Sequence, residues 1–202
     1  MIKTIIFDFG DVFIDLDKPA TLKALQQIGD FELTEDIQNA NNLYETGRID
    51  TPEFLNTYSS VLPKATNQQL TTAWNAILIG FPEHRLNFIK QLAKNKKYTL
   101  ILLSNTNKLH IDWIKKNISF YQEFKQCFDA FYLSHEIHLR KPNRDIYNYV
   151  LNQHQLIPSE VLFIDDTKVN TDAAKNLGIQ VWNNNPEKDD ITNLFTIKSD
   201  LF

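Results

Sequence analysis

Acidic and hydroxyl side chains directly follow three short apolar segments of this chain. These side chains are Asp8, Ser104 and the pair Asp165-Asp166. If the segments lie side by side, three carboxylates meet at one place and repel one another unless a cation lies between them. Carboxylate oxygens are hard ligands, which favours magnesium (Mg²⁺). With such a cation beside it, Asp8 could attack phosphorus, so the pattern indicates phosphoryl chemistry.

The apolar segments before these residues are predicted to be strands of one parallel sheet. They are short, rich in β-branched and aromatic residues and show no alternation, which is typical of strands buried on both faces. Helical patterns separate them, and this alternation predicts a doubly wound α/β fold. Ligands of such folds bind beyond the carboxyl ends of the strands, where the polar residues should gather. The predicted strands cover residues 4–7, 99–103, 161–164 and 179–182, with 131–133 as a weaker candidate, and the predicted helices cover 82–94, 142–152 and 170–177.

A helical insertion interrupts this alternation between residues 16 and 79. It contains no convincing strand, and its aromatic residues are spaced as in the interior of a helix bundle. We therefore predict two domains, a small helical cap over residues 16–79 and an α/β core over 1–15 and 80–202. The predicted cap helices cover residues 20–28, 34–44, 52–61 and 67–78, and the aromatic residues are Tyr44, Phe54, Tyr58 and Trp74.

The composition is that of an ordinary globular protein. Of the 202 residues 43% are hydrophobic, which is enough for one core and a modest insertion. The net charge of -4 offers no basic surface for nucleic acid. A single cysteine excludes an intrachain disulfide, and no apolar stretch approaches the ~20 residues that span a bilayer. We expect a soluble cytoplasmic protein without nucleic-acid or membrane partners, as a monomer or weak homodimer.

Four segments of the chain resemble, in order, the four motifs of the haloacid dehalogenase-like (HAD) hydrolase superfamily. They place an aspartate after the first strand, a serine after the second, a lysine before a helix, and an acidic pair after a later strand. The position of the insertion resembles the subfamily with a helical C1 cap, and several segments are similar to the branch that includes α-D-glucose-1-phosphate phosphatase. The motif segments are residues 6–12 (IFDFGDV), 102–106 (LLSNT), 140–142 (RKP) and 163–166 (FIDD), and the branch resemblance also rests on 44–49 (YETGRI) and 103–110 (LSNTNKLH).

This resemblance implies a HAD-like Rossmannoid core and a magnesium-dependent phosphomonoester hydrolase that forms an aspartyl-phosphate intermediate. Asp8 would be the nucleophile and Lys141 a second catalytic residue, and the substrate would be a small phosphorylated metabolite such as a sugar phosphate. The implied metal ligands are Asp8, the carbonyl of Gly10, Asp166 and Asp165, and the implied phosphate-binding residues are Ser104, Asn105 and Lys141.

The first motif departs from the usual pattern of the superfamily. Most of its phosphatases carry a second aspartate two positions after the nucleophile, as acid toward the leaving group and base toward water, but this chain has Gly10 there. The side chain of Asp11 should point elsewhere, since direction changes with each residue. Asp15 and Asp17 remain candidates, and the acid/base stays unassigned.

Gly10 leaves other functions open. A metal-independent 2-haloacid dehalogenase also lacks this acid, but it has no reason to crowd Asp165 and Asp166 beside its nucleophile. A phosphomutase would need the missing group. A non-catalytic binding protein with this fold would have no need for an acidic cluster at strand ends.

Two groups of basic residues are expected outside the site. The five histidines show no metal-ligand spacing, so surface or loop positions are predicted for them. Arg48 and Arg140 are possible anion contacts, with a solvated position as the default.

Overall fold

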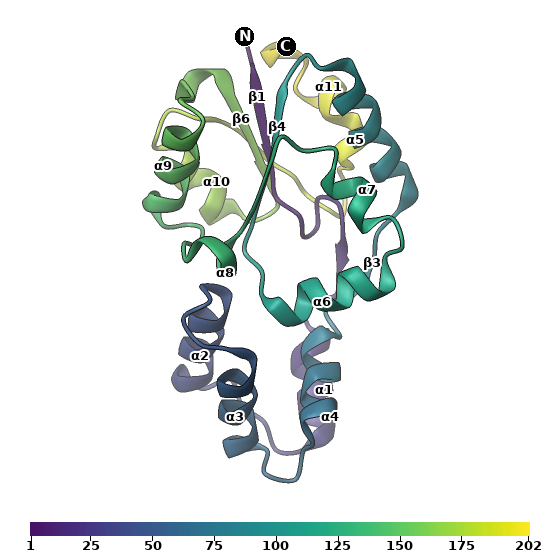
Figure 1. Cartoon of the computed structure of the whole chain (residues 1–202), viewed down its shortest axis with the longest axis vertical. Helices are drawn as coiled ribbons and strands as arrows, with labels where there is room; N and C mark the ends of the chain where they lie inside the picture. The colour runs from purple at the N-terminus through teal and green to yellow at the C-terminus, as the bar shows by residue number, and fades with distance from the viewer.

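Five parallel strands form the centre of the computed structural model, which describes all residues from Met1 to Phe202 (Figure 1). The strand order is β5-β4-β1-β6-β7, so β1 lies in the middle. Phe7, the last residue of β1, is level with Leu102 on one side and Ile164 on the other. The predicted α/β fold with a parallel sheet is confirmed. The strands are β1 (Thr4–Phe7), β4 (Thr99–Ser104), β5 (Ala130–Leu133), β6 (Val161–Asp165) and β7 (Gln180–Asn183).

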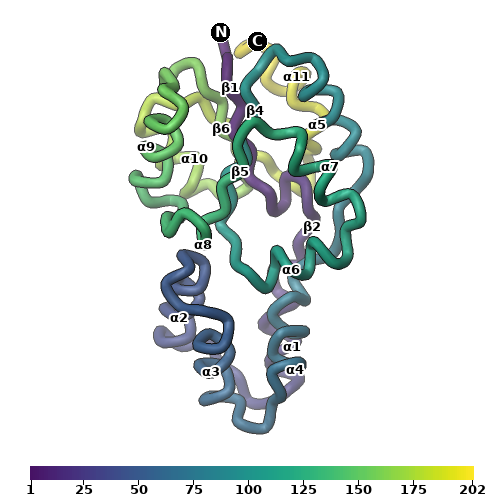
Figure 2. Tube along the Cα trace, viewed as in Figure 1, coloured from purple at the N-terminus to yellow at the C-terminus, as the bar shows by residue number.

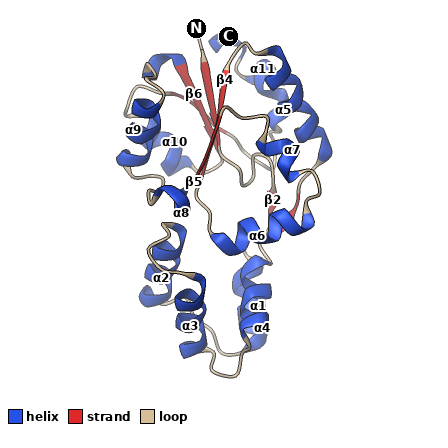
Figure 3. Cartoon of the chain, viewed as in Figure 1, coloured by secondary structure: helices blue, strands red, loops and turns tan.

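Helices cover both faces of this sheet (Figure 3). Successive side chains of a strand point to opposite faces, and accordingly Ile5 and Phe7 belong to one buried cluster and Ile6 to another. The first cluster packs against α5, α6, α7 and α11, and the second against α9 and α10. The helices of this part are α5 (Glu83–Asn95), α6 (Lys108–Asn117), α7 (Tyr121–Lys125), α8 (Ser134–Ile137), α9 (Arg144–Gln153), α10 (Lys168–Lys175) and α11 (Leu194–Ile197).

Four further helices lie together at one end of the molecule, beyond the carboxyl ends of the strands (Figure 2). Two of them begin with capping boxes, in which Asp50 pairs with Glu53 and Thr66 with Gln69. The four aromatic residues predicted for the interior of the insertion share one buried cluster there, as expected. The helices are α1 (Ala20–Ile28), α2 (Glu35–Glu45), α3 (Thr51–Val61) and α4 (Asn67–Asn75). None of the helices in the protein combines the length and hydrophobicity needed to cross a membrane.

Two short antiparallel strands join this helical end to the rest of the molecule. β2 (Asp15–Leu16) pairs with β3 (Leu78–Gly80) where the chain leaves and re-enters the sheet region. The prediction of an insertion without strands is therefore wrong at its two ends, and the last helix stops at Asn75 rather than at residue 78. Strands of two or three residues are too short to show a periodic pattern in the sequence.

A partly buried ion-pair network holds the C-terminal segment to this junction. The guanidinium of Arg85, on α5, donates to Asp15 Oδ1 at 2.7 Å and to Asp190 Oδ2 at 3.0 Å. Burial opposes the charge of Asp190, but hydrogen bonds from His84, Thr192 and Arg85 hold the pKa of its carboxyl well below the usual value. Arg85 is itself 8% exposed, so it depends on both carboxylates.

We expect Asp190→Asn to lower the free energy of unfolding by about 1–2 kcal/mol at pH 7, a modest loss because water partly screens Asp190. Since folding lowers the pKa of Asp190, its contribution is present above the unfolded value of about 4 and disappears as the pH falls through the folded pKa. Urea denaturation of the wild type and of Asp190→Asn, at neutral and at acidic pH, measures this difference in the free energy of unfolding. Asp200→Asn is the control, and equal midpoints for Asp190→Asn and wild type at pH 7 would contradict the prediction.

Candidate active site

A buried lysine lies at the carboxyl end of the central strands. Lys141 Nζ is 2.7 Å from Asp8 Oδ1 and 2.7 Å from Asp165 Oδ2, and its side chain is 1% exposed. Burial disfavours the ammonium, yet Asp165 and Asp8 raise the pKa of Lys141 above its ordinary value. Lys141 is therefore a fixed positive charge between two carboxylates.

The carboxylate of Asp165 is fully occupied by protein donors. Its Oδ1 accepts a hydrogen bond from the backbone N–H of Thr167 at 2.8 Å, and both oxygens accept from Asn170 Nδ2 at 3.1 Å. Asn170 lies in the first turns of α10, the helix that follows β6. Together with the bond to Lys141, these contacts fit Asp165 for orienting the lysine.

Asp8, Asp165 and Asp166 form an acidic cluster whose oxygens lie within 4.8 Å of one another. Burial, with the charges of Asp165 and Asp166, raises the pKa of Asp8 to about 7 in spite of Lys141. On the outer side, Lys18 Nζ lies 2.6 Å from Asp166 Oδ2 and 2.9 Å from Asp11 Oδ2. Two ammonium groups thus face four carboxylates, and a divalent cation with oxygen ligands fits the remaining negative charge.

The serine predicted to bind phosphate is followed by a residue that contacts this lysine. Ser104 ends β4 and is 3% exposed. The next residue, Asn105, exchanges two hydrogen bonds of 2.9 Å with the backbone of Lys141, one through Nδ2 and one through Oδ1. The side chain of Asn105 therefore ties the loop of Lys141 to the end of β4. All the predicted site residues thus come from the ends of β1, β4 and β6 and from this one loop.

A cavity of about 190 Å³ extends from Gly10, Ser104 and Asn105 toward the helical end of the molecule. Its other wall includes Glu45, the last residue of α2, and His110 from α6. The cavity therefore lies where a group bound to the lysine and the acidic cluster would meet the inserted helices.

Three residues near this cavity, Glu45, His110 and Arg140, were not among the site residues predicted from the sequence. Arg140, expected to be solvated, is partly buried and its Nη2 lies 2.9 Å from Glu45 Oε2. His110, expected at the surface or in a loop, stacks on Trp74 with 5.2 Å between the ring centroids. Burial lowers the pKa of His110 to about 4. All three residues lie in segments that carry the family resemblance, and this was the sign available in the sequence.

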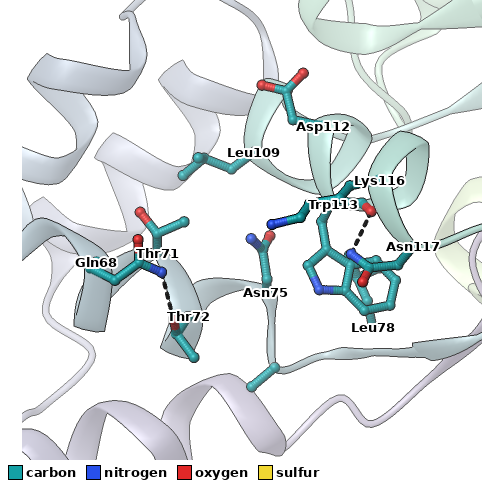
Figure 4. A pocket seen from close by; sticks show the side chains of 11 residues that line it. Gln68, Thr71, Thr72, Asn75, Leu78, Leu109, Asp112, Trp113, Lys116 and Asn117 are labelled. Atoms are coloured by element: carbon teal, nitrogen blue, oxygen red, sulfur yellow. Dashed lines mark hydrogen bonds between the residues drawn. The ribbon is translucent and has the colours of Figure 1, made fainter.

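A larger cavity of about 580 Å³ lies between α4 and α6 (Figure 4). Its wall includes Asn75, Trp113, Lys116 and Asn117, with Asn117 Nδ2 donating to the carbonyl of Trp113 at 2.8 Å. None of the residues of the acidic cluster lines it. The ends of the strands, rather than this larger cavity, hold the groups that can do chemistry.

Comparison with known proteins identifies similar chains. The sequence profile of haloacid dehalogenase-like hydrolases matches residues 2–178. A D-ribitol-5-phosphate phosphatase of Bacteroides thetaiotaomicron is 29% identical over 191 residues, which are 90% of this chain and 91% of the relative. A HAD family enzyme of the same organism, solved in complex with magnesium, is 31% identical with a TM-score of 0.86 and coverage of 96% and 98%. A structure of that enzyme with magnesium and inorganic phosphate has a TM-score of 0.82, 31% identity and coverage of 96% and 100%.

Proposed function

Because this chain belongs to the haloacid dehalogenase-like hydrolases, we propose that it is a magnesium-dependent phosphomonoester hydrolase acting on a small sugar or sugar-alcohol phosphate. The observation that carries the proposal is the buried ammonium of Lys141 between Asp8 and Asp165, with Asp166 beside them. Two similar proteins of Bacteroides thetaiotaomicron support the proposal: one is a D-ribitol-5-phosphate phosphatase, and the other is a HAD family enzyme solved in complex with magnesium and inorganic phosphate.

In the proposed reaction, Asp8 is the nucleophile. One oxygen of Asp8 attacks phosphorus while the ester bond to the leaving group breaks, and Lys141, 2.7 Å from Asp8 Oδ1, holds the carboxylate in place. Water then hydrolyses the aspartyl phosphate. Ser104 and Lys141 bind the phosphoryl oxygens, where a fixed charge stabilises the transition state.

We assign the metal to the outer side of the cluster, where it would take the place of the exposed ammonium of Lys18 at Asp166. Asp8, Asp166 and the carbonyl of Gly10 would hold magnesium, which when bound offsets the negative charge of the carboxylates and of the phosphoryl group. Asp165 was predicted as a fourth ligand, but its oxygens are taken by Lys141, Asn170 and a backbone N–H. We therefore propose that Asp165 positions Lys141.

The same charges argue against a 2-haloacid dehalogenase. Its substrate is an anion, and the site already holds more carboxylates than ammonium groups. Without a metal, a second anion would meet strong repulsion at Asp8 and Asp166. We propose that phosphate esters are the substrates, because magnesium would offset their negative charge at this site.

The size of the cavity limits the leaving group. Sites for drug-sized ligands measure about 300–1,000 Å³. The cavity beside Gly10 and Ser104 is smaller, at about 190 Å³, and suits a group the size of a five- or six-carbon sugar. We propose that residues 16–79 act as the cap that closes over this group, and that the protein acts in the cytoplasm, where its single cysteine stays reduced.

Phosphate release from a panel of esters tests this function. We expect hydrolysis of D-ribitol 5-phosphate and glucose 1-phosphate with magnesium, a kcat/KM at least about tenfold lower for adenosine monophosphate, and loss of activity in excess chelator. Added magnesium should restore the rate. Equal activity under chelator would contradict the proposal and call for an assay of halide release from haloacids.

A further inference from the structure

The proposed reaction needs a proton for the leaving group, and position 10 does not provide one. Gly10 has no side chain, and Leu16 fills the space beside it. A Cβ atom at Gly10 would lie 2.7 Å from Leu16 Cδ1, closer than such atoms approach without a shift. The acid must therefore come from elsewhere.

The aspartates near the nucleophile point away from the cavity. Asp11 accepts a hydrogen bond from the backbone of Leu16 and pairs with Lys18. Asp15 pairs with Arg85. Asp11, Asp15 and Asp17 line a cavity that is separate from the one beside Gly10. The candidates left open by the sequence thus do not face the leaving group.

Among the residues that line the cavity beside Gly10, only His110 and Glu45 have titratable side chains. Both ring nitrogens of His110 are engaged, Nδ1 with Asn107 Nδ2 at 3.1 Å and Nε2 with the carbonyl of Trp74 at 3.3 Å. This arrangement fits the neutral ring, as does its lowered pKa of about 4. His110 therefore has no free nitrogen for a substrate.

Glu45 is held in place with one oxygen free. Arg140 Nη2 binds Oε2 at 2.9 Å, and the hydroxyl of Ser134 donates to the backbone carbonyl of Glu45 at 2.6 Å. Oε1 has no hydrogen-bond partner in the protein. Burial raises the pKa of Glu45, although Arg140 and Lys141 oppose it, so the protonated form is more available than in water.

We propose that Glu45, supplied by the inserted helices, is the general acid that protonates the leaving group, in place of the acid absent at Gly10. This inference rests on the proposed function and adds a catalytic residue to it. As Asp8 forms its bond to phosphorus, the bond from phosphorus to the ester oxygen breaks and its electron pair stays on that oxygen. The oxygen takes the proton from Glu45, which is left as a carboxylate.

Glu45→Gln tests this role through the dependence on leaving group. An alkyl phosphate such as D-ribitol 5-phosphate expels a strongly basic oxygen and needs the acid, whereas p-nitrophenyl phosphate expels a weakly basic one. The value of kcat/KM covers only the steps up to aspartyl-phosphate formation when that step is irreversible. We expect kcat/KM to fall about 10²-fold or more for the alkyl phosphate and less than about threefold for the aryl phosphate.

Glu35→Gln, at the exposed start of the same helix, is the matched control and should change neither value. Retained aryl turnover also shows that the Glu45→Gln protein is folded and binds magnesium. An equal loss for both substrates would overturn the inference, since it would indicate a role in cap position rather than proton transfer. No change for either would overturn it as well. A wild-type protein that hydrolyses neither ester with magnesium would overturn the proposed function and this inference with it.

Discussion

Asp8→Asn is expected to abolish phosphate release, with kcat falling by about 10⁴-fold or more. The carboxamide has the size of the carboxylate, but it is not a nucleophile toward phosphorus. Asp8 lies at the end of β1, 8% exposed and in contact with Lys141, so no other carboxylate can take its place at the same position. Phosphate release from D-ribitol 5-phosphate with magnesium measures the effect.

The stability of the same variant separates chemistry from folding. The carboxamide introduced at position 8 would still offer an oxygen to Lys141, and one negative charge leaves a cluster that is short of cations. We therefore expect the melting temperature of Asp8→Asn to equal or exceed that of the wild type. Asp172→Asn, in an exposed ion pair with Lys168, is the control for activity. Activity in Asp8→Asn within tenfold of wild type would rule out Asp8 as the nucleophile.

Lys141→Gln should lower kcat by about 10²- to 10³-fold, because a fixed positive charge beside the phosphoryl group is lost. It should also lower the free energy of unfolding by about 3 kcal/mol or more, since Asp8 and Asp165 remain buried without their partner. The two effects are measured by steady-state kinetics and by urea denaturation.

The matched control for this variant is Lys168→Gln. Lys168 also pairs with a carboxylate, that of Asp172, but its side chain is 75% exposed. Exposed pairs contribute about 0–1 kcal/mol, so neither stability nor kcat should change appreciably. A Lys141→Gln protein with normal kcat would show that the lysine has a structural role alone.

The sheet and the residues at its strand ends could be predicted from the sequence because both follow from local patterns. Strands buried on two faces are continuous apolar runs, and a parallel sheet brings their carboxyl ends together. Asp8, Ser104 and Asp165 were placed correctly on this basis, next to one another at the ends of β1, β4 and β6.

The contacts across the cavity could not be predicted in the same way. Glu45 and Arg140 are 95 residues apart. Taken alone, each is a charged residue that would be expected on the exposed surface of a helix or loop. Lys18 and Asp166 are 148 residues apart. Such pairs depend on how the inserted helices sit against the strand ends, and no periodicity in a single sequence encodes that position.

The two members of the acidic pair also could not be distinguished from the sequence. Adjacent residues at a strand end point in different directions, so Asp165 faces Lys141 and Asn170 while Asp166 faces Lys18. Asp165 is held by buried donors, whereas Asp166 is held by the exposed Lys18, and this difference depends on the loops of Lys141 and of α10, which follow from tertiary packing.

The close packing of Leu16 against Gly10 also bears on how this enzyme can evolve. A mutation that introduces an acid at position 10 would bring a Cβ atom to 2.7 Å from Leu16 Cδ1, which is the far end of a flexible side chain. A small rotation of the Leu16 side chain would make room, so an acid could be gained at position 10 in a single step. The form with the acid on the inserted helices and the form with the acid two residues after the nucleophile would thus be one substitution apart at this position, and a lineage could pass between them without a compensating change at Leu16.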